Sequence, residues 1–203
     1  MRVKRETVEW VKFMSVETEK HDLPRVLLVG DSITDGYFRA VAERLNGECY
    51  VDYLAVAYSV DMPIYHRLVM MMVRENKYDV IHFNHGLHCG HMKDIGLYQS
   101  KTEELLRRIG TDRIILANST IAYQPKTMIW AENWKNQLPK LNAAVDRIAE
   151  NLNLPLNDLF TVSAGLKEDG LSGDGLHYSP IGYCALADAV AGKIRDFLKA
   201  KKA

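Results

Sequence analysis

The chain has 203 residues, which is enough for one domain with a substantial hydrophobic core. Lysine plus arginine and aspartate plus glutamate each total 26, so the formal net charge is zero. A neutral chain offers no electrostatic basis for binding nucleic acid or an anionic membrane, and no apolar run approaches the length of a membrane span.

The first 24 residues precede the first predicted strand and form an N-terminal extension. Its apolar residues are spaced as in an amphipathic segment that packs on the body of the domain: Val8, Trp10, Val11, Phe13 and Met14. Residues 1–9 are charged and lack the apolar stretch of a secretion signal. The three cysteines, odd in number and widely spaced, fit a reducing compartment. We therefore expect a cytoplasmic protein in which residues 25–203 form a single domain.

From residue 25 onward, strand and helix patterns alternate. Short apolar and β-branched runs predict five strands, at residues 26–29, 50–56, 79–83, 113–117 and 154–159. Helical periodicity predicts helices at residues 37–46, 63–75, 99–109, 134–152 and 180–198. This alternation predicts an α/β domain of three layers (α/β/α) with a five-stranded parallel sheet, a flavodoxin-like arrangement with right-handed crossovers.

Ser32 lies in the turn between the first strand and the first helix. Gly30 ends the apolar run, and polar residues of the helix-capping type follow it. A hydroxyl at the carboxyl end of a parallel strand lies where open α/β sheets place ligands, and the nearby helix N-terminus favours developing negative charge. Taken alone, Ser32 could equally be a helix cap. We expect Asp31 to accept hydrogen bonds from the turn backbone rather than to act as an acid or base.

A second stretch, residues 172–180, contains the partners that a nucleophilic serine needs. Asp174 and His177 lie three residues apart in a Gly-rich loop that precedes the last predicted helix. A serine hydroxyl is a weak nucleophile until a base removes its proton, and the base needs a carboxylate to fix its tautomer. Ser32, His177 and Asp174 are therefore candidates for a catalytic triad.

The two stretches together resemble a known family. Gly30-Asp31-Ser32-Ile33 and Asp174-Gly175-Leu176-His177 resemble the first and last blocks of the SGNH (GDSL-type) hydrolases. Their order and their separation across a domain of about this length match as well. The resemblance covers roughly residues 25–198, and it implies the same flavodoxin-like fold.

The resemblance implies a carboxylic ester hydrolase that uses an acyl-enzyme and needs no cofactor. Ser32 would be the nucleophile, His177 the base and Asp174 the carboxylate that orients it. Members of the family include esterases, lipases, thioesterases and carbohydrate O-deacetylases. No long apolar run suggests a lipid tunnel, and the polar, histidine-rich rim of the site favours a short acyl group, such as acetyl, on a polar or carbohydrate alcohol. A thioesterase or lipase of the same family, or a non-catalytic binding module on the same fold, is the alternative.

The two oxyanion blocks depart from the family's usual pattern. Tyr58 stands where the family has a glycine after the second strand, and His88 stands where it has the asparagine of a Gly-x-Asn block. We expect the backbone N–H of Ser32, the main chain at Tyr58 and the side chain of His88 to form the oxyanion hole, because an imidazole N–H can donate as an amide does. Asn84 is a second candidate donor, or a residue that shapes the loop.

A histidine cluster raises the alternative of a metal site. His82, His85, His88 and His91 fall at a spacing of three, with Cys89 among them. The first lies in a predicted strand, where side chains alternate between faces, and glycines at 86 and 90 interrupt any helix that would align the others. We therefore expect no metal site, and we expect His82 to be a core histidine.

Residues 121–134 form a long aromatic connection of the kind that serves as a lid or a partner surface. The oligomeric state does not follow from the sequence, and a homodimer through this connection is one candidate. A small-molecule ester is the expected partner. Asn142 and Asp158 fall at positions where the family often shows an asparagine and an aspartate, and we expect both to be structural.

Overall fold

The computed structural model describes residues 5–202, so the first four residues of the predicted extension and the last residue of the chain lie outside the described residues. Within this range the strands are β1 (Val11–Met14), β2 (Arg25–Gly30), β3 (Tyr50–Val56), β4 (Val80–Asn84), β5 (Ile114–Ala117) and β6 (Leu156–Asn157). The helices are α1 (Ser32–Arg44), α2 (Pro63–Glu75), α3 (Ile95–Ile109), α4 (Glu132–Lys135), α5 (Leu138–Leu152), α6 (Leu159–Ala164) and α7 (Pro180–Lys202). None of these helices is long and apolar enough to cross a membrane.

The strands form one sheet with the order β1-β3-β2-β4-β5-β6. Strands β2 to β6 are parallel, which confirms the predicted α/β fold with a parallel sheet. The described residues hold one strand more than predicted, because β1 adds to the edge beside β3 in antiparallel orientation. All four residues of β1 are exposed, so no buried stripe marks this strand in the sequence, and backbone pairing with β3 defines it.

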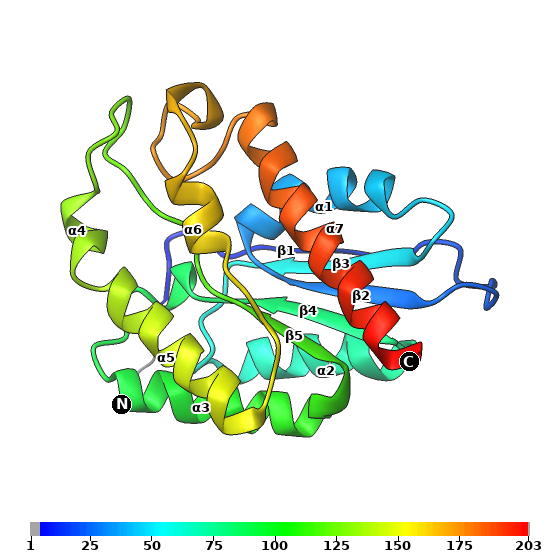
Figure 1. Cartoon of the computed structure of the whole chain (residues 1–203). Helices are drawn as coiled ribbons and strands as arrows, with labels where there is room; N and C mark the ends of the chain where they lie inside the picture. Colours follow the sequence, from blue (N-terminus) through cyan, green and yellow to red (C-terminus); the bar gives the residue numbers. More distant parts are fainter. Residues whose placement is uncertain (1–4, 203) are drawn as a thin grey trace.

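Helices cover both faces of the sheet (Figure 1). Alternate residues of β2 point to opposite faces: Leu27 and Val29 belong to the core beneath α2, α3 and α5, while Val26 and Leu28 belong to the core beneath α1, α6 and α7. A strand that is apolar on both faces is typical of a parallel sheet with two helical layers. The three predicted layers are therefore present.

Several helix boundaries differ from the sequence-based expectation. Helix α3 begins at Ile95 rather than at residue 99, and α7 runs to Lys202 rather than to residue 198. Two further differences have a clear local cause. Helix α1 begins at Ser32 rather than at residue 37, because the side chain of Asp31 caps it by accepting a hydrogen bond from the backbone N–H of Ile33. The helix predicted at 134–152 is two helices, α4 and α5, since Pro139 in the first turn of α5 has no N–H to continue a preceding helix. The short helix α6 carried no clear periodicity and was not predicted.

Candidate active site

Three of the predicted site residues lie at or just beyond the carboxyl ends of neighbouring strands. In the register of the sheet, Gly30 of β2 pairs with Ala55 of β3, and Val29 pairs with Phe83 of β4. Ser32, Tyr58 and Asn84 therefore lie at one edge of the sheet. Strand order reverses between β2 and β4, and the crevice at such a reversal is where open α/β sheets bind ligands.

At the turn before Ser32, the backbone of Gly30 lies close to the side chain of Thr34 and to the carbonyl of Asn84. A Cβ at Gly30 would overlap the side chain of Thr34 and lie 3.0 Å from the carbonyl oxygen of Asn84, so only glycine fits there. Ser32 is the first residue of α1, where a backbone N–H has no acceptor within the helix. This N–H and the helix dipole favour negative charge beside the Ser32 hydroxyl.

The structure brings the three predicted triad side chains together. Nε2 of His177 lies 2.9 Å from Oγ of Ser32, although the two residues are 145 positions apart in the chain. Nδ1 of the same ring lies 2.6 Å from Oδ2 of Asp174. A serine hydroxyl, an imidazole and a carboxylate in this order are the arrangement that activates a serine nucleophile.

Asp174 is held in its ionised form. Its partial burial favours the neutral acid, but donated hydrogen bonds outweigh burial and hold the pKa of this carboxyl well below its usual range. The Ser172 hydroxyl donates at 2.5 Å, and the backbone N–H groups of Leu176 and His177 each donate at 2.9 Å. A carboxylate fixed in this way keeps the Nδ1 proton on the His177 ring and leaves Nε2 to accept a proton.

The aromatic connection at residues 121–134 packs against the loop that carries Asp174 and His177. The backbone N–H of Tyr123 donates to the carbonyl of Gly175 at 2.7 Å, and the Tyr178 hydroxyl donates to the carbonyl of Ile121 at 2.8 Å. Gly175 has a φ of +75°, and a Cβ there would overlap the Tyr123 carbonyl. This connection therefore supports the loop that carries Asp174 and His177; its predicted role as a dimer surface stays a prediction.

The three predicted oxyanion candidates besides Ser32 have different surroundings. Tyr58 lies two residues beyond β3 and is buried. The side-chain amide of Asn84 donates to the carbonyl of Asn118 at 2.9 Å, which joins the ends of β4 and β5 and fits the loop-shaping alternative. The His88 ring is mostly buried, and its Nδ1 lies 2.6 Å from Oε1 of Glu6.

Comparison with solved structures identifies the fold. The chain superposes with a TM-score of 0.72 on a lipase/acylhydrolase from Enterococcus faecalis, at 19% identity over 86% of this chain and 96% of that one. For Axe2, an acetylxylan esterase from Geobacillus stearothermophilus, the TM-score is 0.67 at 19% identity over 84% and 94% of the two chains. For a GDSL-like lipase from Bacteroides thetaiotaomicron it is 0.61 at 15% identity over 85% and 88%. The chain has the fold of the SGNH (GDSL-type) hydrolases. No family model and no curated protein sequence matches it.

Within this SGNH fold, the histidine cluster is dispersed. His82 is buried in β4 with Nε2 3.0 Å from Nδ2 of Asn157, which confirms it as a core histidine, while His85 stacks on Tyr65 with ring centroids 4.1 Å apart. Burial lowers the pKa of each of these two rings to about 3. His91 faces Asp61 at 3.9 Å. Among residues 5–202, no three His, Cys, Asp or Glu side chains come together to hold a metal ion.

Two residues of the site were not predicted from the sequence. Ser172 donates to Asp174, and its position two residues earlier in the same loop is a signal that could have found it. Glu6 contacts His88 across 82 positions of the chain, and no local pattern marks such a contact. Asn142, by contrast, bonds both backbone groups of Ser119, as expected of a structural residue.

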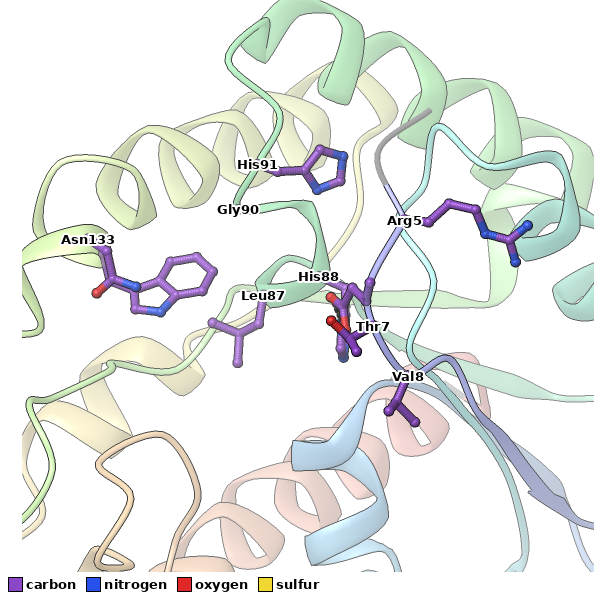
Figure 2. A pocket seen from close by; sticks show the side chains of 10 residues that line it. Arg5, Thr7, Val8, Leu87, His88, Gly90, His91 and Asn133 are labelled. Carbon is purple, nitrogen blue, oxygen red and sulfur yellow. Dashed lines mark hydrogen bonds and ion pairs between the residues drawn. The ribbon is translucent and has the colours of Figure 1, made fainter. Parts of the chain in front are cut away.

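A cavity of about 680 Å³ opens between the N-terminal segment, the turn after β4 and helix α4 of the SGNH fold. Figure 2 shows Leu87 and His88 on the turn, Thr7 and Val8 on the N-terminal segment, and Asn133 on the other side. Polar and apolar groups share the lining, which also includes the Trp134 ring.

Proposed function

We propose that this protein is a serine ester hydrolase that works through an acyl-enzyme. One observation carries the proposal: the Ser32 hydroxyl, the His177 imidazole and the Asp174 carboxylate form a continuous chain of short contacts, 2.9 and 2.6 Å long. Residues from the two ends of the domain meet in the order that this chemistry requires. The likeness of the fold to lipases and esterases supports the same reaction class.

In the first half of the reaction, Ser32 Oγ forms a bond to the carbonyl carbon of the ester while its proton passes to Nε2 of His177. The electron pair of the carbonyl moves onto oxygen and gives a tetrahedral oxyanion. When the oxyanion collapses, the bond to the leaving alcohol breaks, and His177 returns its proton to the alcohol oxygen. The acyl group then remains on Ser32.

In the second half, water replaces the alcohol. His177 removes a proton from the water as its oxygen attacks the acyl carbon, and collapse returns that proton to Ser32 and releases the acid. The backbone N–H of Ser32, the main chain at Tyr58 and the side chain of His88 are the proposed oxyanion donors. Loss of one such donor costs about 3 kcal/mol of barrier in serine hydrolases.

For the substrate, we propose a short acyl group, such as acetyl, on a polar or carbohydrate alcohol. The cavity beside His88 has room for a sugar-sized alcohol, and its lining combines the Trp134 ring with the polar side chains of His91 and Asn133, although Ser32, Asp174 and His177 are not among the lining residues. One structural neighbour is an acetylxylan esterase, which acts on a substrate of this class.

The test is the loss of a reactive serine. Wild-type protein should hydrolyse p-nitrophenyl acetate faster than longer p-nitrophenyl acyl esters, and a fluorophosphonate probe should label it once per chain. Ser32→Ala should abolish both labelling and turnover, while the circular dichroism spectrum stays unchanged. Ser100→Ala is the matched control, because that hydroxyl donates only to the Leu97 carbonyl on the exposed surface of α3.

Activity that survives Ser32→Ala would contradict the proposal. Wild-type protein that is neither labelled nor active would favour a non-catalytic binding module on the same fold. A series of acetylated sugars, assayed by release of acetate, then tests the substrate class.

A further inference from the structure

A second cavity, of about 330 Å³, opens between the start of α2 and one side of α3. These two helices cover the same face of the sheet (Figure 1). The charged and polar side chains of its lining come from both helices and from the loop before α2: Asp61, His66, Arg67, Lys101, Glu104 and Arg108. It shares no lining residue with the cavity beside His88, and none of the triad residues lines it. This cavity is therefore distinct from the candidate active site.

The spacing of residues along the two helices explains why these side chains gather. On α3, Lys101, Glu104 and Arg108 follow one another at intervals of three and four residues, which places them on one side of a helix. On α2, His66 lies in the first turn, and its Nε2 is 2.7 Å from the Val60 carbonyl. A carbonyl only accepts hydrogen bonds, so Nε2–H donates and the ring is held in place. The lining therefore has a fixed wall on α2 and a charged row on α3.

Positive charges outnumber negative charges in this lining, three to two. The Lys101 ammonium lies 2.9 Å from the Glu104 carboxylate, so these two charges compensate each other. Arg67 and Arg108 are exposed, and neither has a hydrogen-bond or ion-pair partner among residues 5–202. Two unpaired guanidinium groups from different helices therefore face one cavity, where a shared anion would turn their mutual repulsion into attraction.

The geometry of the guanidinium group favours one class of anion. A guanidinium presents its N–H donors as a planar fork, and a single fork already matches both oxygens of a carboxylate. A phosphoryl group has at least three oxygens in a tetrahedral arrangement, so forks from two helices can bond it at the same time. Two arginines on separate helices are thus better matched to a phosphoryl group than to a carboxylate.

We propose that the cavity between α2 and α3 binds a phosphoryl group, as free phosphate or as the phosphate ester of a small molecule, between the guanidinium groups of Arg67 and Arg108. Lys101 adds a third positive charge beside them, while the Asp61 carboxylate at the start of α2 opposes an anion and limits the affinity. The site is separate from Ser32 and His177. The proposal therefore stands or falls independently of the serine hydrolase function.

The experiment is isothermal titration calorimetry of the full chain with inorganic phosphate at neutral pH. In 0.15 M NaCl, where charges more than about 8 Å apart are screened, we expect one site with a Kd of about 1 mM. Arg67→Gln and Arg108→Gln should each raise the Kd by about tenfold, because each removes a charged donor. Glu104→Gln should lower it, since it frees Lys101 from its ion pair. Circular dichroism checks that every variant is folded.

Arg74→Gln is the matched control, because Arg74 is an exposed arginine on α2 that does not line the cavity, and its Kd should stay within about twofold of wild type. An equal loss of affinity in Arg74→Gln and Arg67→Gln would mean general attraction of anions and would overturn the proposal. So would the absence of saturable phosphate binding to wild-type protein, or acetate that binds as tightly as phosphate. Glycerol phosphate distinguishes the two sources: tighter binding than inorganic phosphate assigns the site to a phosphate ester, and equal or weaker binding assigns it to free phosphate.

Discussion

Asp31 is a carboxyl group that lies fully buried beside the proposed nucleophile. Its Oδ1 accepts the backbone N–H of Ile33 at 2.9 Å, while Oδ2 has no hydrogen-bond partner among the described residues. Burial raises the pKa of Asp31, although the nearby charges of His88 and His177 and the helix N-terminus act in the opposite direction. The expectation that Asp31 accepts a hydrogen bond from the turn backbone is confirmed. The buried carboxyl also lowers the stability of the folded state, by an amount that depends on pH.

The direction in which stability changes with pH follows from proton binding. An unfolded Asp releases its proton near pH 4, whereas folded Asp31 holds it to higher pH, so the folded state loses stability as pH rises above about 4. Asp31→Asn keeps an oxygen acceptor for Ile33 and has no proton to lose. We expect the variant to gain in Tm relative to wild type between pH 4 and pH 8, measured by thermal unfolding. Asp112→Asn, at an exposed position, is the control. A difference in Tm that stays constant across this range would contradict the assignment.

At the scale of elements, helix α7 contains two glycines in opposite surroundings. A Cβ at Gly182, in the first turn, would overlap the backbone carbonyl of Gly170 and lie 3.0 Å from the Cβ of Tyr178. A Cβ at Gly192 would meet nothing within 4 Å. The first glycine lets the helix pack against the loop before it, and that loop leads to Asp174.

The same substitution should therefore have opposite effects at these two positions. Gly182→Ala forces backbone to move and should lower the free energy of unfolding by about 1–3 kcal/mol. Gly192→Ala should raise it by up to about 1 kcal/mol, because alanine has the higher helix propensity. Urea denaturation of both variants measures the difference. Equal effects would mean that packing at the start of α7 is looser than the structure indicates.

Elements with buried apolar runs were predictable, and those without them were not. The run at residues 26–29 predicts β2 because both faces of that strand are buried. Strand β1 is exposed along its length and depends on pairing with β3, so its sequence gives no such signal. The predicted start of α1 was wrong because the cap at Asp31 sets where the helix begins. A single capping side chain is a weaker signal in a sequence than a periodic apolar face.

At the scale of the whole molecule, the candidate site likewise contains residues that the sequence predicts and a contact that it does not. Ser32, Asp174 and His177 could be predicted because their chemistry has a sequence signature in a strand-turn-helix context and in a short loop. The contact of Glu6 with His88 could not be predicted, since it depends on β1 running antiparallel to β3 and so bringing the N-terminal segment beside the turn after β4. This contact therefore depends on where the extension is anchored to the domain.

That anchor is a buried ion pair between Arg25 and Asp52. The guanidinium donates to the Val16 carbonyl at 2.8 Å and to the Asp52 carboxylate at 3.0 Å. The same carboxylate accepts the backbone N–H of Val16 and the hydroxyl of Tyr78, each at 2.9 Å. The segment between β1 and β2 is thereby tied to the sheet beneath it.

Removing one partner should leave the other as a buried, uncompensated charge. We expect Arg25→Met to lower the free energy of unfolding by about 3–5 kcal/mol in urea denaturation. The double variant Arg25→Met/Asp52→Asn should recover much of this loss, because the amide oxygen can still accept from the Val16 N–H while the amide NH2 donates to the Tyr78 hydroxyl, and no charge is left buried. Arg195→Met is the matched control: it removes an arginine that pairs with Glu48 at the surface, and should cost less than about 1 kcal/mol. A double variant as unstable as Arg25→Met would contradict this explanation. The loss of stability would then come from the missing hydrogen bonds between the guanidinium and the segment between β1 and β2, and not from an unpaired Asp52 carboxylate.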